Sequence, residues 1–162
     1  MNEVTCQVVT VLLKPSVVRE DLATIGVIVR CEASGFAGFK LIDPNAERVN
    51  DLDRFFQGYG VANIRKAIAW AEGDIHFALA RERQPDGKGM FENLIRPREN
   101  VVRYGAPRVA LTADPAALLD REYRKLADND NGGNGLNSPL AMAEIDGKRR
   151  NMIYYLHEKC DK

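Results

Sequence analysis

The chain has 162 residues, of which 45% are apolar and 28% charged, and its 23 basic and 23 acidic side chains give a formal net charge of zero. This composition excludes a collagen-like chain, a disulfide-dense miniprotein and a wholly disordered chain. The zero net charge argues against a protein that coats nucleic acid or an anionic membrane through bulk charge. The length suits one domain with one core.

Three strands are predicted in the first part of the chain. They are rich in Val, Ile, Thr and Phe and are separated by turn residues: Val4–Leu13, Thr24–Cys31 and Phe36–Asp43. The connections are too short for a crossover helix, so we expect an antiparallel meander. The middle strand is apolar enough to lie centrally in the sheet. Gly26 within it indicates a bulge or a close backbone approach.

Helices are predicted next. Asn45 is a plausible N-cap for a short helix, and a longer amphipathic helix runs from Val61 to about Arg83. Its apolar stripe contains Ile64, Ile68, Ala71 and Ile75. Two short strands follow, at 100–104 and 108–112, and Asp114-Pro115 then begins another helix.

Together these elements predict an α+β fold. We expect an antiparallel sheet of about five strands, with the long amphipathic helix and the shorter helices packed on one face. The predicted domain spans residues 1–127. A Gly- and Asn-rich linker or loop follows at 128–138, and an apolar tail at 139–162 is expected to dock.

The three cysteines, Cys6, Cys31 and Cys160, form no CxxC pair, and the first two lie in apolar strands. We therefore expect buried free thiols, no disulfide framework and a reducing compartment. The start of the chain has no signal-peptide pattern, and no apolar run approaches the length that spans a bilayer. The expected location is the cytoplasm, with no membrane partner.

Signatures of catalysis and metal binding are weak. The two histidines, His76 and His157, lie far apart, and there is no HExxH motif or cysteine pair, so we expect no metal and no cofactor. Asp86-Gly87-Lys88 has the Asp-x-Lys spacing of some metal-dependent nucleases, but its glycine and proline neighbours favour a turn. No catalytic residue is identified.

Two charged features are candidates for binding. Arg19 and Glu20 lie on a loop before the central strand, where they are either solvated or form a structural ion pair, for example with Arg103. Residues 81–108 carry seven basic and four acidic side chains, and Arg96, Arg98 and Arg103 are the candidate contacts there. A local patch of this kind steers an acidic partner or touches phosphate, although charged residues commonly just cover a surface.

Three segments of the chain resemble the bacterial DUF3037 family, a domain of unknown function. They are a strand and proline turn leading through Arg-Glu to Ile-Gly-Val (11–29), the run Arg-Glu-Asn-Val-Val-Arg (98–103), and Asp-Pro at the start of a leucine-bearing helix (114–115). Family members usually have Asn before Ile-Gly-Val, where this chain has Thr24. The resemblance implies a small bacterial cytosolic domain with no established activity. It also associates the chain loosely with kinases similar to the HipA type, as protein partners.

These observations support three hypotheses. The first is a non-catalytic protein-interaction module, an accessory or regulatory subunit of another protein. The second is nucleic-acid binding or processing through residues 81–108. The third is an enzyme acting on a phosphorylated small molecule, which would require one pocket to gather Asp43, Glu20 and Arg103.

Overall fold

The computed structural model describes residues 2–16, 18, 20–130 and 153–155. The elements follow in the order β1 (Val4–Leu13), β2 (Ala23–Cys31), the 3-10 turn η1 (Glu32–Ser34), β3 (Phe36–Leu41), α1 (Arg48–Phe55), α2 (Val61–Glu82), α3 (Met90–Leu94), β4 (Val102–Tyr104), β5 (Arg108–Thr112), α4 (Pro115–Asp130) and β6 (Ile153–Tyr155).

The strands form one antiparallel sheet in the order β4-β1-β2-β3-β6, and β5 also pairs with β1. The predicted meander of β1, β2 and β3 is confirmed, and so is the α+β class. β4 and β5 do not pair with each other, because they follow one another along the same side of β1. Together they make one edge of the sheet, and β6 lies beyond β3 at the other.

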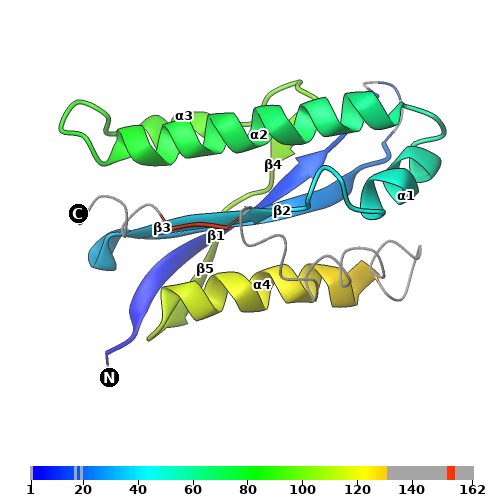
Figure 1. Cartoon of the computed structure of the whole chain (residues 1–162). Coiled ribbons are helices and arrows are strands. Elements are labelled where there is room, and N and C mark those ends of the chain that lie inside the picture. Colours follow the sequence, from blue (N-terminus) through cyan, green and yellow to red (C-terminus); the bar gives the residue numbers. More distant parts are fainter. Residues whose placement is uncertain (1, 17, 19, 131–152, 156–162) are drawn as a thin grey trace.

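Helices cover both faces of this sheet (Figure 1). α2 lies on one face, with Ile64, Ile68, Ala71 and Ile75 buried as the stripe predicted. The prediction that all helices pack on one face of the sheet is wrong. α4 packs against β2 and β3 on the face opposite α2. The reason is that β3 is buried along its whole length and β2 almost throughout, so both faces need a cover.

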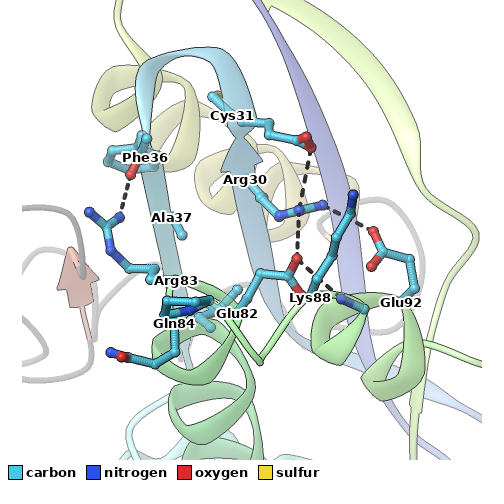
Figure 2. A pocket seen from close by; sticks show the side chains of 14 residues that line it. Arg30, Cys31, Phe36, Ala37, Glu82, Arg83, Gln84, Lys88 and Glu92 are labelled. Carbon is cyan, nitrogen blue, oxygen red and sulfur yellow. Dashed lines mark hydrogen bonds and ion pairs between the residues drawn. The ribbon is translucent and has the colours of Figure 1, made fainter.

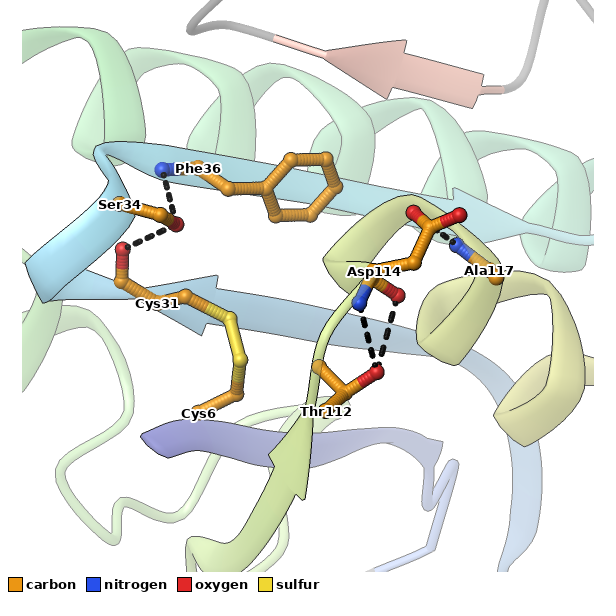
Figure 3. Close-up of a disulfide and its surroundings, with 7 residues drawn as sticks. All are labelled: Cys6, Cys31, Ser34, Phe36, Thr112, Asp114 and Ala117. Atoms are coloured by element: carbon orange, nitrogen blue, oxygen red, sulfur yellow. Dashed lines mark hydrogen bonds between the residues drawn. A yellow bond between two sulfur atoms is a disulfide. The ribbon is translucent and has the colours of Figure 1, made fainter. Parts of the chain in front are cut away.

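The sequence predicted caps for α4 and for α1, and the structure has the cap only at α4. Asp114 caps α4, since its carboxylate accepts the amide of Ala117 at 3.2 Å (Figure 3). α1 begins at Arg48, later than an Asn45 cap would place it. Asp43 instead accepts the Asn45 amide at 2.8 Å and closes a turn, which delays the helix.

A disulfide joins Cys6 of β1 to Cys31 of β2 (Figure 3). Both cysteines are fully buried, as expected, but the expectation of free thiols is wrong. The register pairs Gln7 with Arg30, so the next residues outward, Cys6 and Cys31, face each other with Cα atoms 4.2 Å apart. The 25-residue separation hides this pairing in the sequence. The cytoplasmic location stays a prediction.

Most of the C-terminal segment lies outside the described residues, so the linker at 128–138 and the docking of the 139–162 tail stay predictions. α4 continues to Asp130, and residues 153–155 form the short edge strand β6. Among the helices that the structure describes, none is long and apolar enough to cross a membrane.

Gly26 lies where β2 passes very close to β3. A Cβ at this position would collide with the Leu41 side chain and with the Lys40 carbonyl oxygen, and the β1–β2 register shifts beside it. The prediction of a close approach at Gly26 is confirmed.

We predict that Gly26→Ala lowers the free energy of unfolding by about 2 kcal/mol, because the added methyl group overpacks a closed core. Gly73→Ala is the matched control, since its Cβ would meet nothing within 4 Å on α2, and it should stabilise the protein by roughly 0.5–1 kcal/mol. Urea unfolding measures both. Equal effects of the two substitutions would contradict the close packing at Gly26.

Candidate functional site

A pocket of about 660 Å³ opens between the β2–β3 turn, the C-terminal end of α2 and the segment that leads into α3 (Figure 2). Arg30 of β2 is among its lining residues, and its side chain is only 11% exposed. Arg83 and Lys88 also line the pocket, so it contains three cationic groups.

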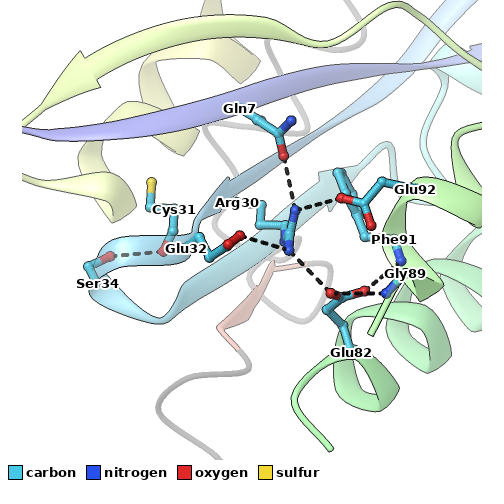
Figure 4. Close-up of polar contacts among 9 residues, drawn as sticks. All are labelled: Gln7, Arg30, Cys31, Glu32, Ser34, Glu82, Gly89, Phe91 and Glu92. Atoms are coloured by element: carbon cyan, nitrogen blue, oxygen red, sulfur yellow. Dashed lines mark hydrogen bonds and ion pairs between the residues drawn. The ribbon is translucent and has the colours of Figure 1, made fainter. Parts of the chain in front are cut away.

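The Arg30 guanidinium is surrounded by acceptors (Figure 4). Its Nη1 donates to Gln7 at 3.1 Å and to Glu92 at 3.2 Å, and its Nη2 donates to Glu82 at 3.3 Å. Glu32 adds a further carboxylate at 3.6 Å. With carboxylates on several sides, this guanidinium is not open to an external anion.

Glu82 extends the same network into the backbone. It accepts the amide of Phe91 at 2.9 Å and that of Gly89 at 3.4 Å, while the Phe91 ring centroid lies 5.0 Å from the Arg30 guanidinium carbon. Arg30 therefore clamps β2 to α2 and α3, and the large pocket has a structural ion-pair network at its base.

Other basic side chains of the 81–108 segment also have partners. Arg81 pairs with Asp86 at 2.9 Å, and Arg83 donates to a backbone carbonyl of the β2–β3 turn at 2.6 Å. Arg108 pairs with Glu122 of α4 at 2.7 Å. The positive charge that the sequence places on this segment is thus partly neutralised by the fold.

A second cavity, of about 270 Å³, brings the three remaining arginines of the segment together. Arg96 and Arg98 come from the connection after α3, and Arg103 from β4. Trp70 of α2 and Tyr104 of β4 line the same cavity. We call this cavity, with these five side chains, the arginine–tryptophan pocket.

The arginines of this pocket differ in their contacts. Arg103 pairs with Glu99 at 3.1 Å, an exposed carboxylate. Arg98 donates to the backbone and side-chain oxygens of Asn93 at 2.8 and 3.0 Å, which orients its guanidinium without cancelling its charge. Arg96 is exposed and has no acidic partner among the described residues. Neither Arg96 nor Arg98 forms an ion pair within the described part of the chain, although the Asp74 carboxylate lines the same cavity.

Tyr104 adds a hydroxyl group whose ionisation is suppressed. Burial raises the pKa of Tyr104 well above its ordinary value, the Asp74 carboxylate raises it further, and the Arg98 charge opposes both. The phenol therefore stays protonated at neutral pH and can donate a hydrogen bond. Trp70, in contrast, is 60% exposed, so a large indole surface faces solvent beside the arginines.

The predicted binding residues thus divide into two groups. The structure brings Arg96, Arg98 and Arg103 together, whereas Glu20 lies elsewhere and pairs with Lys14 at 3.8 Å. The suggested ion pair between Glu20 and Arg103 is absent from the structure, because Arg103 pairs with Glu99 instead. Arg19 lies outside the described residues.

The three residues proposed as a catalytic set have separate contacts. Asp43 accepts a turn amide, Glu20 pairs with Lys14, and only Arg103 lines one of the three cavities described for this structure. No group of three or more His, Cys, Asp or Glu side chains within the described residues is placed to hold a metal ion.

The family model for a protein of unknown function, DUF3037, matches residues 9–127 of this chain. The chain belongs to the DUF3037 family. No curated protein and no solved structure matches it. The DUF3037 region includes the arginine–tryptophan pocket in full and most of the sheet, without the first half of β1 and without β6. Thr24, which precedes Ile-Gly-Val, pairs with Leu12 of β1 near the start of β2.

Trp70 is the functional candidate that sequence reasoning missed in this DUF3037 chain. The helical spacing of α2 could have identified it, because Trp70 does not lie on the buried face that contains Ile68 and Ala71. A single exposed apolar side chain is common on a protein surface, so it is the position of Trp70 beside the three arginines that makes it a functional candidate.

The Arg108–Glu122 pair makes the stability of this protein depend on pH. Burial, the largest single influence, raises the pKa of Glu122, but hydrogen bonds and charges from Arg108 and Lys125 together lower it below its ordinary value of 4.5. A carboxyl with a lower pKa in the folded state stabilises the fold above its unfolded pKa, and that contribution is lost as pH falls through the folded pKa.

We predict that Glu122→Gln lowers the free energy of unfolding by about 1 kcal/mol at pH 7. The difference from wild type should shrink below pH 4.5. Urea unfolding at pH 7, 5, 4 and 3 measures it. Glu99→Gln is the control, since its exposed carboxylate should matter little at any pH. A pH-independent loss in Glu122→Gln would contradict the ionic role.

Proposed function

We propose that this DUF3037 protein is a non-catalytic binding module that holds an anionic ligand in the arginine–tryptophan pocket. The observation that carries the proposal is the convergence of Arg96, Arg98 and Arg103 on one cavity. They come from two separate elements, and within the described residues Arg96 and Arg98 have no carboxylate partner, whereas Arg81 and Arg108 are paired with Asp86 and Glu122.

The chemistry of these groups favours binding over catalysis. A guanidinium group stays protonated at all physiological pH values and offers several donors in a plane, so it holds carboxylate and phosphate oxygens but transfers no proton. Tyr104 is also protonated at neutral pH, as a phenol already is at its ordinary pKa, and its raised pKa only strengthens this. The charged groups of the pocket therefore suit orientation and recognition of an anion.

The charge distribution supports a local contact over an extended one. The chain as a whole is neutral, so a long polyanion would meet as many repulsive as attractive groups beyond the pocket. Attraction to a small anion acts within a Debye length, about 8–10 Å at ordinary ionic strength, and is weakened by salt.

We predict that inorganic tripolyphosphate binds the wild-type protein and that its affinity falls as NaCl is raised from 50 to 200 mM. The double variant Arg96→Ala/Arg98→Ala should bind at least about tenfold more weakly, because it loses two charge-assisted contacts. Isothermal titration calorimetry measures the dissociation constants.

Arg121→Ala is the matched control, because it removes the same charge from α4 on the opposite face of the sheet and should leave the affinity unchanged. Equal affinity of the double variant and the wild type, or no dependence on salt, would overturn the proposal.

A second candidate function is docking to a partner protein through β5. Within the described residues, no strand pairs with the outer edge of β5, whereas β6 lies against the outer edge of β3. Val109 and Leu111 of β5 are 72% and 60% exposed on the same face. An edge that is apolar and unprotected by lysine, proline or a bulge accepts a further strand.

The partner that fits this edge is an extended segment of another protein, with apolar residues at alternate positions to meet Val109 and Leu111. The resemblance to the DUF3037 family loosely associates the chain with kinases similar to the HipA type, and such a kinase is one partner to test. This would make the protein an accessory or regulatory subunit.

We predict that Val109→Lys/Leu111→Lys keeps the fold but loses a stoichiometric partner in affinity purification from the native host. Val18→Lys is the control, since it adds a charge at an apolar residue that is also exposed, at 86%, on a loop outside β5. The purified partner should then protect the β5 amides from hydrogen exchange. Recovery of the same partner with the double variant, or no protection of β5, would contradict this docking.

A further inference from the structure

The arginine–tryptophan pocket combines two kinds of recognition chemistry. Arg96, Arg98 and Arg103 supply cations and donors, whereas Trp70 supplies a flat aromatic surface from a different element. A simple anion such as phosphate or an acidic side chain uses only the first of these. The exposed indole suits a ligand that also contains a planar ring.

Polar groups complete the lining. Asp74 lies one helical turn after Trp70 on α2, and it is close enough to Tyr104 to raise the pKa of that phenol. Asn100 also lines the cavity. A carboxylate, a protonated phenol and an amide provide acceptors and donors for sugar hydroxyl groups and for the edge of a heterocyclic base.

The size of the pocket limits the ligand. Its volume of about 270 Å³ lies just below the roughly 300–1,000 Å³ of sites for drug-sized molecules. One ring system with a sugar fills such a cavity, and a phosphate chain extends past the exposed arginines toward solvent.

We propose that the arginine–tryptophan pocket binds a nucleoside phosphate, with the phosphates held by Arg96, Arg98 and Arg103 and the base stacked on Trp70. This inference rests on the proposed function, because it names the class of anion that the module recognises. The nucleoside phosphate is either a free nucleotide or a unit of a nucleic-acid strand, since both present the same chemistry to the pocket.

The free nucleotide is the better match to the surroundings. A strand would need further cations along its path, but Arg81 and Arg108 are paired with carboxylates and the chain has no net charge. Phe77 is 61% exposed two helical turns beyond Trp70, but it does not line the cavity.

The test compares ATP with tripolyphosphate by isothermal titration calorimetry without divalent metal, so that both probes carry a similar charge. ATP should bind roughly 10-fold more tightly, which is within the range that stacking of one base on an aromatic side chain provides. Trp70→Ala should abolish this advantage, so that ATP and tripolyphosphate bind the variant with about equal affinity. Phe77→Ala, the matched aromatic control on the same helix, should keep it.

The outcomes separate this inference from the proposed function. If ATP and tripolyphosphate bind equally in the wild type, or if the advantage of ATP survives in Trp70→Ala, the nucleoside phosphate is overturned while the anion site stands. If neither probe binds, both proposals fail. Both aromatic side chains are exposed, so their removal leaves the core intact, and circular dichroism checks the fold.

A single-stranded decanucleotide without divalent metal distinguishes the two sources. Binding of ATP as tight as that of the decanucleotide, or tighter, identifies the free nucleotide. Much tighter binding of the decanucleotide that is also weakened by Trp70→Ala identifies a strand. Binding of the decanucleotide that ignores both Trp70→Ala and Arg96→Ala/Arg98→Ala contradicts a role for the pocket in either case.

Discussion

The burial of β2 on both faces is the constraint from which the rest of this architecture follows. The adjacent residues Val27 and Ile28 point to opposite faces of the sheet and are both fully buried, so neither face can be left in water, and a helix is required above the sheet and another below it. α2 and α4 supply these covers (Figure 1). The inner sides of both helices pack on the sheet, so recognition is left to their outer faces and to the sheet edge formed by β4 and β5.

Arg30 is the exception within this apolar strand, and it explains how the basic segment is divided. A buried guanidinium is tolerated only where carboxylates and an aromatic ring surround it, and the structure draws Glu82 and Glu92 onto it for that purpose. Those glutamates are then not free to neutralise Arg96 and Arg98 farther along the chain. The ion-pair network at the large pocket and the open charge at the small one are two results of the same distribution of acidic groups.

Periodicity predicted most of the secondary structure, because alternation in β1 to β3 and the three/four spacing of α2 record which side chains must be buried. Contacts between segments that are distant in the sequence produce no such periodic pattern and could not be predicted from it. The pairing of Cys6 with Cys31 depends on strand register, and the position of α4 depends on which face α2 leaves open. Arg96, Arg98 and Arg103 were identifiable as a basic cluster, but their common cavity with Trp70 exists only because β4 lies beside α2.

The Cys6–Cys31 disulfide has a consequence for the life of the protein after folding. It joins the two central strands at one end, so these strands cannot slip past each other by a register step while the bond is intact. Both sulfur atoms are buried, and a thiolate must reach a sulfur atom to exchange with it. Reduction therefore requires the end of the sheet to open. A disulfide that forms during folding then persists when the surrounding redox conditions later change.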